Sequence, residues 1–511
     1  MTATRGDGAA PGSGVLVLDE VTVPRDVHGR VDLQACVRAL DPVDLLESGD
    51  HAGWHYLVPH GPWRLVDDGR RSALLADGRA VRDLGPDPFA AIDRLCTELG
   101  AHPDASVEEG LPALSGGLVG ALSYDLGRRV ERLPDLATAD RVGAHLSLRI
   151  AEVVCAITPG RDRALLLARP LPRSLTWART PEQRARARFQ EVRDTLARAT
   201  RAHDRTRPPD PVVLGPQVAW TSLPREDHLT AVEAILAAIG AGAVFQVNLA
   251  QRLSAHWPGD VHDLYRALRA ASPAAFGAAL PDIGVASISP ETFLSVDGPT
   301  VTTRPIKGTR PRARDAALDA ALADDLATAA KDRAENVMVV DLERNDLGRV
   351  CRPGTVRVPE LTRVEEHPTV WHLVSTIRGE LRPGTGYGDL LRATFPCGSI
   401  TGAPKIAAMA LIERLERVRR GWYCGGIGFL APGHARLSVA IRTAVLGRDG
   451  VVDHGAGGGI VADSDPMGEH AETLDKAAAF LRAVRATRVA DRAPERGRPP
   501  AGHLATGRLR P

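Results

Sequence analysis

The irregular succession of strand-like and helical patterns is the feature that most constrains the fold of this chain. Strand-like apolar runs at 146–157, 245–255 and 371–381 interleave with helical patterns at 181–206 and 315–346, without a repeating strand–helix–strand unit. Such a chain stacks its sheets in layers and covers them with helices. We therefore predict an α+β fold with a layered, sandwich-like β-sheet core and helices packed outside it.

Proline-rich sequence divides the chain at one place. The Arg-rich helical pattern at 181–206 runs into RPPDPVVLGP, whose prolines end a helix and favour a linker. Both ends of the chain are rich in Pro, Gly and Arg and have no apolar periodicity. The predicted order is a disordered N-terminus (1–14), an N-terminal region (15–205), a linker (206–215), a second region (216–486) and a disordered tail (487–511).

Composition excludes several kinds of partner. The 64 basic and 63 acidic residues give a net charge of +1, which argues against a broad surface for nucleic acid or anionic membrane. There is no apolar leader and no unbroken apolar run of about 18 residues, so neither secretion nor membrane insertion is expected. The six cysteines are far apart and form no C-x-x-C pair, so we expect neither a disulfide framework nor a structural metal. A cytoplasmic protein that acts on a small molecule fits best.

Lysine is rare, and one lysine stands in an unusual segment. Only four of the 64 basic residues are lysines: Lys307, Lys331, Lys405 and Lys476. The first lies in RPIKGTRPR (304–312), which lacks the glycine spacing of a P-loop, and arginine would serve equally well in a nucleic-acid patch. The remaining functional interpretation is an amine nucleophile, which guanidinium cannot replace. We expect the flanking arginines to disfavour the ammonium form: Arg304, Arg310 and Arg312.

Three glutamates could hold a hard cation. Glu469 and Glu472 lie at i and i+3 near the start of a predicted helix, after the glycine run GAGGG, where a ligand can approach the backbone closely. Glu335 precedes the apolar run VMVV and would need a partner if buried. Mg²⁺ held by such carboxylates is one interpretation, and a solvated acidic helix turn is the other. Lys476, on the same helix face, could meet an anionic ligand or pair with Glu472.

Two further segments could carry chemistry. Glu291 follows a proline in SISPETFLS, where a partly apolar turn would raise its pKa and suit a general acid; a solvated glutamate at a sheet edge is the alternative. In FPCGSITGAPK (395–405), Ser399 and Thr401 precede a helix whose first amides could face an anion, although an ordinary capped helix would look the same.

Taken in order, nine segments resemble the chorismate-utilising enzymes, the family of anthranilate synthase component I, aminodeoxychorismate synthase component I, and the isochorismate and salicylate synthases. They lie between residues 240 and 482: FQVNLAQR, ISPETF, RPIKGTRPR, AENVMVVDLERNDLGRV, FPCGSITGAPK, GGIGFL, VAIRT, GGGIVADS and EHAETLDK. The N-terminal region matches through DLLES (44–48) and GGLVGALSYDLGR (116–128). The resemblance implies the fold of anthranilate synthase component I.

The resemblance also implies site residues. Mg²⁺ would sit on Glu335, Glu469 and Glu472 and engage the ring carboxylate of chorismate. Arg442 would bind the enolpyruvyl carboxylate, and Glu291 would protonate the departing C4 hydroxyl. The remaining residues implied to line the site are Gln246, Gly308, Thr309, His372, Thr401, Gly459 and Lys476. Leu46, Glu47 and Ser48 correspond to a tryptophan-binding segment, which could be regulatory, structural or a plain buried turn here.

Two positions separate the reactions of the family. Isochorismate and salicylate synthases place a general-base lysine where this chain has Gln246, and anthranilate synthases typically read PIAGT where this chain reads PIKGT. Lysine there is typical of aminodeoxychorismate synthases, in which the amine adds at C2 and ammonia then adds at C4. We therefore expect 4-amino-4-deoxychorismate, a precursor of p-aminobenzoate and of folate or another metabolite. The alternatives are C2 amination, by an anthranilate or aminodeoxyisochorismate synthase, and a non-catalytic chorismate-binding subunit.

The source of ammonia is expected to be another chain. None of the six cysteines lies in a G-x-C-x-G glutaminase elbow, so we expect a separate glutamine amidotransferase subunit. Two residues depart from the family pattern: Cys397 stands where glycine is usual, and Phe429 where tyrosine is frequent.

Overall fold

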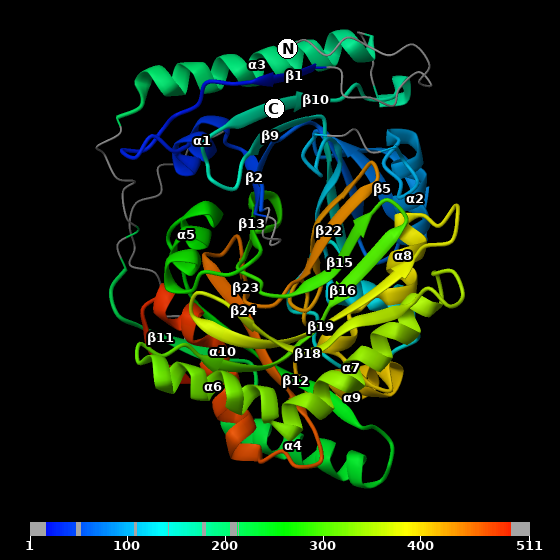
Figure 1. The fold of residues 1–511 in the computed structure, drawn as a ribbon, viewed down its shortest axis with the longest axis vertical. Coiled ribbons are helices and arrows are strands. Elements are labelled where there is room, and N and C mark those ends of the chain that lie inside the picture. Colours follow the sequence, from blue (N-terminus) through cyan, green and yellow to red (C-terminus); the bar gives the residue numbers. More distant parts are fainter. Residues whose placement is uncertain are drawn as a thin grey trace, which may run out of the picture.

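Two large β-sheets form the centre of the computed structural model, and helices surround them (Figure 1). The structure describes residues 17–47, 53–106, 110–141, 143–175, 180–204, 212 and 214–491. Within these residues one sheet has 13 strands and the other has 12. The predicted layered α+β fold is confirmed.

The sheets are mostly antiparallel, and their strands can be given in spatial order. The first sheet contains β1 (Val17–Glu20), β10 (Ala164–Ala168), β9 (Val153–Ile157), β3 (His55–Pro59), β2 (Val43–Glu47), β13 (Gly277–Leu280), β14 (Val285–Ser287), β23 (Thr443–Leu446), β24 (Val451–Ile460), β12 (Gln246–His256), β11 (Gln217–Thr221) and β25 (Ala486–Ala490), with β20 (Gly402–Ala403) beside β12. The second contains β17 (Ile306–Pro311), β19 (Val370–Glu380), β16 (Thr300–Arg304), β15 (Thr292–Asp297), β22 (His434–Val439), β21 (Gly426–Ala431), β7 (Gly117–Leu122), β8 (Leu146–Ala151), β4 (Trp63–Asp67), β5 (Ser72–Ala76) and β6 (Arg79–Gly85), with β18 (Arg357–Glu366) beside β19.

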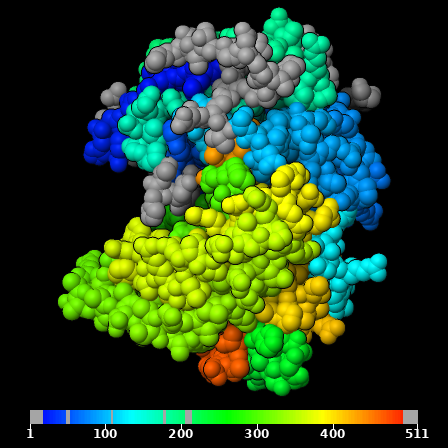
Figure 2. Space-filling model, turned by 45° about the vertical axis from the view of Figure 1, so that its right-hand side comes forward, coloured from blue at the N-terminus to red at the C-terminus, as the bar shows by residue number. Residues whose placement is uncertain are grey.

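The helices lie around the outside of the two sheets (Figure 1). They are α1 (Leu33–Leu40), α2 (Pro88–Leu99), α3 (Pro181–Ala202), α4 (Arg225–Gly240), α5 (Val261–Ala271), α6 (Ala316–Thr328), α7 (Ala330–Gly348), α8 (Tyr387–Thr394), α9 (Lys405–Leu415) and α10 (Pro466–Ala483), with short 3₁₀ turns η1 (Tyr124–Arg129), η2 (Arg173–Leu175), η3 (Pro281–Ile283) and η4 (Gly398–Ile400). In the space-filling view, α6, α7 and β18, coloured yellow-green, form one continuous part of the surface (Figure 2). Among the described residues, no helix is both long enough and apolar enough to cross a bilayer.

Each sheet is assembled from both halves of the chain and has a single seam between them. In the first sheet β2 of the N-terminal region pairs with β13, and in the second β7 pairs with β21. Of the two segments that carry the N-terminal resemblance, DLLES includes all of β2 except Val43, and GGLVGALSYDLGR contains β7. The second seam is tight, because a Cβ on Gly117 would lie 2.2 Å from the Leu430 carbonyl oxygen.

Two strand-like runs pass from one sheet to the other. The run at 146–157 divides into β8 and β9 at Glu152, and the run at 435–447 divides into β22 and β23 near Arg442. Arg442 takes the left-handed conformation, with φ of 48°. A residue with a Cβ rarely adopts this conformation. The chain therefore passes from one sheet to the other through an unusual backbone conformation at Arg442.

Three predicted boundaries differ in the structure. The helix predicted at 315–346 is two helices, because Ala329 between α6 and α7 has an extended ψ of 103°. The helical sequence pattern APKIAAMALIERLERVRR (403–420) predicts a helix to residue 420, but the helix ends at Leu415, where Glu416 is extended. The chain is ordered beyond residue 486 as β25, which pairs in parallel with β11. The remainder of the tail, the N-terminus and most of the linker lie outside the described residues.

A core shared by the two sheets makes them one layered body. Its buried residues come from strands of both sheets, among them Tyr56 of β3 and Phe429 of β21. These two rings meet edge to face, with centroids 5.6 Å apart. A hydroxyl on residue 429 would enter this apolar core, which agrees with phenylalanine at that position.

Candidate functional site

The predicted acid, Glu291, and the predicted nucleophile, Lys307, both hydrogen-bond to Ser399. Glu291 is buried, with 4% of its surface exposed, so a solvated sheet-edge glutamate is excluded. Lys307 Nζ donates to the Ser399 carbonyl oxygen at 3.1 Å. The Ser399 hydroxyl hydrogen-bonds the Glu291 carboxyl, whose other oxygen, Oε1, is buried without a partner. Burial raises the pKa of Glu291, which Lys307 and the hydrogen bonds only partly offset.

Lys307 differs from the other lysines of the chain. Among the described residues it makes no salt bridge, whereas each of the others pairs with a carboxylate: Lys331 with Glu469 at 3.4 Å, Lys405 with Asp346 at 2.5 Å and Lys476 with Glu472 at 2.7 Å. An amine that is not held by a carboxylate keeps its nitrogen available for a ligand.

The three flanking arginines are all paired with carboxylates. Arg304 pairs with Glu365, Arg310 with Asp325 and Asp332, and Arg312 with Asp319 and Glu366. Each positive charge is therefore compensated, so these arginines are not the uncompensated cations that the prediction assumed. The sequence could not show this, because the carboxylates come from α6, α7 and β18.

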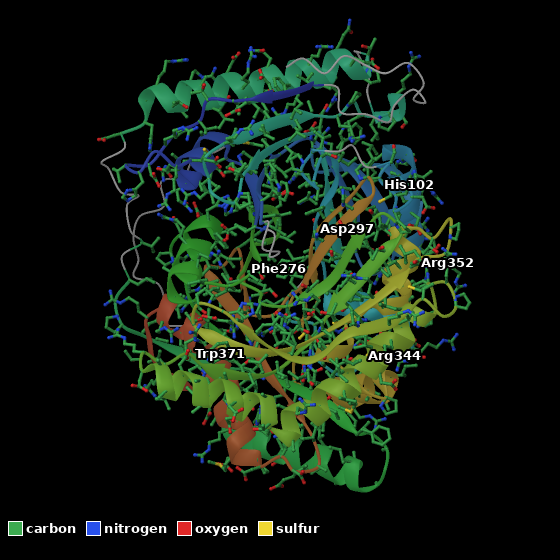
Figure 3. The ribbon with its side chains drawn as sticks, in the orientation of Figure 1. His102, Phe276, Asp297, Arg344, Arg352 and Trp371 are labelled. Atoms are coloured by element: carbon green, nitrogen blue, oxygen red, sulfur yellow. The ribbon has the colours of Figure 1, made fainter. Side chains whose placement is uncertain are left out.

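The paired arginines anchor the strand that carries Lys307. The Arg312 guanidinium stacks 4.4 Å from the centre of the Trp371 ring, and the indole N–H of Trp371 donates to Asp319 at 3.2 Å. Trp371 lies at the end of β19 beside α6 (Figure 3). Gly308, next to the lysine, has φ of 83°, and a Cβ there would lie 2.9 Å from Asp332 Cγ. These contacts fix the direction in which Lys307 leaves β17.

The three predicted metal ligands come from α7 and α10. Asp465 caps α10 by accepting from the Gly468 amide at 2.7 Å, and Pro466 occupies the first helical position, which places Glu469 and Glu472 in the first two turns. A Cβ on Gly458 of β24 would lie 3.1 Å from Glu469 Oε2 and 3.6 Å from Glu472 Oε1. The two carboxylates therefore converge over a strand that has no side chain at this point.

The charges of these glutamates are linked. Burial raises the pKa of Glu335, and Glu469 is one of the charges that add to the rise. Burial would also raise the pKa of Glu472, but Lys476, Lys331 and Lys307 together lower it.

These residues fit a hard cation, although they do not form a finished site. Glu469 Oε2 is buried without a hydrogen-bond partner, and the carboxylate oxygens are acceptors. Among the described residues, no three His, Cys, Asp or Glu side chains are close enough to hold a metal as they stand. Lys331 and Lys476 now occupy part of the carboxylate surface and would share it with an ion.

Arg442 is a half-buried cation without a counter-ion among the described residues. Its side chain has no hydrogen bond or salt bridge among the described residues, and burial lowers its pKa. His372 lies nearby and accepts or donates at 2.9 Å to the Thr309 hydroxyl through Nδ1. Burial, followed by the Arg442 charge, lowers the pKa of His372 to about 3, so this imidazole is neutral at neutral pH. The neighbourhood can therefore accept an anion.

Gln246 and Gly459 are in direct contact on neighbouring strands. A Cβ on Gly459 would lie 2.1 Å from Gln246 Nε2, so the glycine makes room for the buried glutamine. Thr401 is fully buried and donates to the carbonyl oxygens of Cys397 and Gly398, at 3.2 and 3.1 Å. Thr401 thus holds the η4 turn, so the hydrogen of its hydroxyl is already used, and its role in substrate binding stays a prediction.

The candidate tryptophan-binding segment lies elsewhere, at the seam of the first sheet. Glu47 contacts His55 at 3.0 Å and Arg269 at 3.1 Å and accepts from Tyr265. A cavity of about 20 Å³ adjoins Leu46 and Glu47, which is space for a water molecule rather than an indole. Ser48 lies outside the described residues, and tryptophan binding stays a prediction.

Sequence reasoning missed two residues beside the acid. Glu343 of α7 is buried and accepts from Thr303 Oγ1 at 2.8 Å and from Cys397 Sγ at 3.3 Å. Its position, two turns after Glu335 on the same helix, was an available signal of a second inward carboxylate. Ser399 was noted only for a helix end, not as the link between Lys307 and Glu291.

A cavity of about 520 Å³ lies away from this cluster. Four arginines line it, and each is already paired: Arg64 and Arg149 with Asp282, Arg184 with Glu152, and Arg188 with Glu191. It offers no uncompensated charge, so we place the candidate site at Lys307, Glu291 and Arg442.

Comparisons with known proteins agree with the predicted resemblance. The chain matches the chorismate binding enzyme family over residues 81–482. Aminodeoxychorismate synthase component 1 of Klebsiella aerogenes is 38% identical over 440 residues, covering 84% of this chain and 91% of that protein. Anthranilate synthase component 1 of Mycobacterium bovis is 37% identical over 475 residues, covering 86% and 87%. The crystal structure of anthranilate synthase component I from Streptococcus pneumoniae TIGR4 matches with a TM-score of 0.69 at 28% identity, covering 84% and 92%.

Proposed function

The chain belongs to the chorismate-binding enzymes and is of the aminodeoxychorismate or anthranilate synthase type, and we propose that it is the component of an aminodeoxychorismate synthase that aminates chorismate at C4. Its product would be 4-amino-4-deoxychorismate. The observation that carries the proposal is Lys307, an amine without a carboxylate partner that shares Ser399 with the buried Glu291.

Binding would use the uncompensated charge of the site. The Arg442 guanidinium is suited to the enolpyruvyl carboxylate of chorismate, because it is half-buried and has no counter-ion among the described residues. The neutral His372 imidazole and the Thr309 hydroxyl can offer hydrogen bonds beside it. Gln246 and Gly459 would form the opposite wall, in which an amide replaces the lysine that activates water in isochorismate-forming relatives.

The chemistry would proceed in two displacements. Lys307 Nζ forms a bond to C2 while the ring double bond shifts and the C4–O bond breaks; Glu291 gives its proton to the departing hydroxyl, which leaves as water. Ammonia then forms a bond to C4, the double bond shifts back, and the C2–N bond to Lys307 breaks. The raised pKa of Glu291 suits the first step, because the acid must hold a proton at neutral pH.

Glu335, Glu469 and Glu472 would hold Mg²⁺, which when bound supplies positive charge for the ring carboxylate of chorismate. The chain's own contribution is the convergence of two carboxylates over Gly458 and the unpartnered Glu469 Oε2.

Ammonia would come from a glutamine amidotransferase subunit. All six cysteines of the chain are buried, so none is placed as an accessible glutaminase nucleophile. We expect ammonium salts, and not glutamine, to support turnover by the isolated chain.

Product regiochemistry tests the proposal. The chain is incubated with chorismate, Mg²⁺ and ammonium, and the product is treated with the lyase that forms p-aminobenzoate. We expect p-aminobenzoate from the wild type and a loss of C4 amination in Lys307→Ala. Lys307→Arg is the matched variant: it keeps the charge but not the nucleophile, and should also be inactive. C4 amination by Lys307→Ala at the wild-type rate would exclude covalent catalysis.

Amination at C2 is the second candidate, because anthranilate synthases match this chain at nearly the same identity as aminodeoxychorismate synthases. The same assay separates the two: anthranilate would form without the lyase. Anthranilate as the only aromatic product would replace the first proposal with the second.

A further inference from the structure

A buried carboxyl group that the proposed mechanism does not use lies beside the general acid. Glu343 has 4% of its surface exposed, as has Glu291. Glu291 is among the charges that act on Glu343. Two buried carboxyl groups that influence each other cannot both ionise easily, so protons are shared between them.

A continuous set of hydrogen-bonding atoms joins the two carboxyls. Cys397 Sγ lies 3.3 Å from Glu343 Oε1 and 3.4 Å from Ser399 Oγ. The Ser399 hydroxyl in turn bonds the Glu291 carboxyl. Cys397 and Ser399 are both buried, at 3% and 4% exposure, so water does not interrupt the chain. Thr303 holds the far oxygen of Glu343 at 2.8 Å.

We propose that Glu343 is a positioning residue for the general acid, which keeps a proton on Glu291 through the Cys397 thiol and the Ser399 hydroxyl. This inference rests on the proposed acid role of Glu291.

The proton transfer balances along this chain. After Glu291 has given its proton to the leaving hydroxyl, the Ser399 hydroxyl passes its hydrogen to Glu291 and receives that of the Cys397 thiol. The thiol receives the proton of Glu343, which takes another from solvent. No group is oxidised or reduced, and Cys397 and Ser399 end as they began. Burial, with the two carboxyls, raises the pKa of the Cys397 thiol well above its usual range, so this sulfur keeps its hydrogen between transfers.

The surroundings favour a proton on Glu343. Burial, followed by the Glu291 charge, raises the pKa of Glu343 to about 8, and Asp346 on the same helix adds to the rise. Asp346 is itself paired with Lys405 at 2.5 Å. The positive groups that face the pair act on Glu291: Lys307 and, more weakly, Lys476. The thiols of Cys397 and Cys424 face Glu291 as well.

The rate of amination as a function of pH tests the role of Glu343. Glu343→Gln removes the proton donor at the far end of the chain of hydrogen bonds, so Glu291 should regain its proton more slowly wherever Glu343 of the wild type is protonated. We expect the variant to be about tenfold slower than the wild type near pH 6 and to approach the wild-type rate near pH 9, where Glu343 of the wild type has itself lost its proton. A structural defect would instead lower the rate by the same factor at every pH, and that result would overturn the proposal.

Further variants keep the test decisive if Glu343→Gln folds poorly. Glu343→Asp retains a carboxyl that can hold a proton and should recover part of the rate near pH 6. Cys397→Ala breaks the link and should lower the rate near pH 6, and Cys397→Ser, which keeps a donor, should recover more of it. The matched control is Glu233→Gln, an exposed glutamate of α4, whose rate relative to the wild type should be independent of pH.

Infrared difference spectra supply a readout that does not depend on turnover. In the wild type, protonated carboxyl bands should persist to higher pH than in either Glu291→Gln or Glu343→Gln. Independent titration of the two groups would overturn the proposal. Failure of the proposed function gives a different result from failure of this inference, because anthranilate then appears in the product assay. The C4 hydroxyl leaves in that reaction too, so the dependence of the rate on pH can still be measured.

Discussion

Replacing Arg442 with glutamine should make the protein more stable and a poorer binder of chorismate. The guanidinium is half-buried and has no counter-ion among the described residues, so the folded chain bears part of the cost of removing that charge from water. Such a cost is about 1–3 kcal/mol for a fully buried unsatisfied group, so the lower part of that range applies to Arg442. Glutamine keeps the length of the side chain and removes the charge. The left-handed backbone is equally unfavourable for both residues, so it cancels from the comparison.

The loss in binding follows from the same charge. A charge-assisted hydrogen bond to a carboxylate contributes about 1.5–3 kcal/mol, so the dissociation constant for chorismate should rise roughly 10- to 150-fold. The assay combines chemical denaturation of the free protein with calorimetric titration of chorismate. Chorismate should also raise the melting temperature of the wild type much more than that of Arg442→Gln.

Arg420 is the matched control for Arg442. Its side chain is buried and, unlike that of Arg442, pairs with a carboxylate, Glu416, at 2.6 Å and donates to the carbonyl oxygens of Ile400 and Asn248. Arg420→Gln should lower the free energy of unfolding by about 3–5 kcal/mol, because it leaves the buried Glu416 charge unpaired. Equal destabilisation by both substitutions, with chorismate affinity retained in Arg442→Gln, would refute the reasoning.

Three more predictions concern other parts of the site. Gly459→Ala should fold normally but lose chorismate affinity, because its Cβ displaces only the end of Gln246; Gly457→Ala should unfold more easily, because its Cβ would lie 2.5 Å from a backbone oxygen. Burial lowers the pKa of His454 to about 4, so the unfolded chain binds the extra proton and the free energy of unfolding should fall as pH drops from about 6.5 to 4. His454→Gln should flatten this slope by at most about 1.4 kcal/mol per pH unit in denaturation curves. EDTA should abolish amination and Mg²⁺ restore it, and Glu469→Gln should raise the half-maximal Mg²⁺ concentration about tenfold or more; full activity in EDTA would contradict the carboxylate assignment.

Local patterns in the sequence predicted those parts of the site that lie on one element. The cap and the first turns of α10 could be read from SDPMGEHAE, because a capping aspartate, a proline at the first position and two glutamates three residues apart have one helical arrangement. The order of the nine segments identified the family, and so supplied the substrate that no spacing could give.

Contacts between distant elements could not be predicted in this way. Glu291 and Glu343 are 52 positions apart and meet only because α7 packs beside the second sheet. The passage of the chain from one sheet to the other at Arg442 could not be predicted from the sequence either. An apolar run that changes sheets has the same composition as one that stays within a single sheet. The partners of the three flanking arginines come from α6, α7 and β18, so the sequence could not show that their charges are compensated.

The two seams have a consequence for how this chain can be cut. A fragment beginning at residue 216 would expose the edge of β13 in one sheet and of β21 in the other, each with unpaired backbone groups that invite other chains to add strands. Both exposed edges would be glycine-containing and apolar, without charges to block such pairing. We expect the C-terminal region alone to aggregate on expression. Engineering or gene fusion should therefore keep both regions of the chain, so that both sheets are complete.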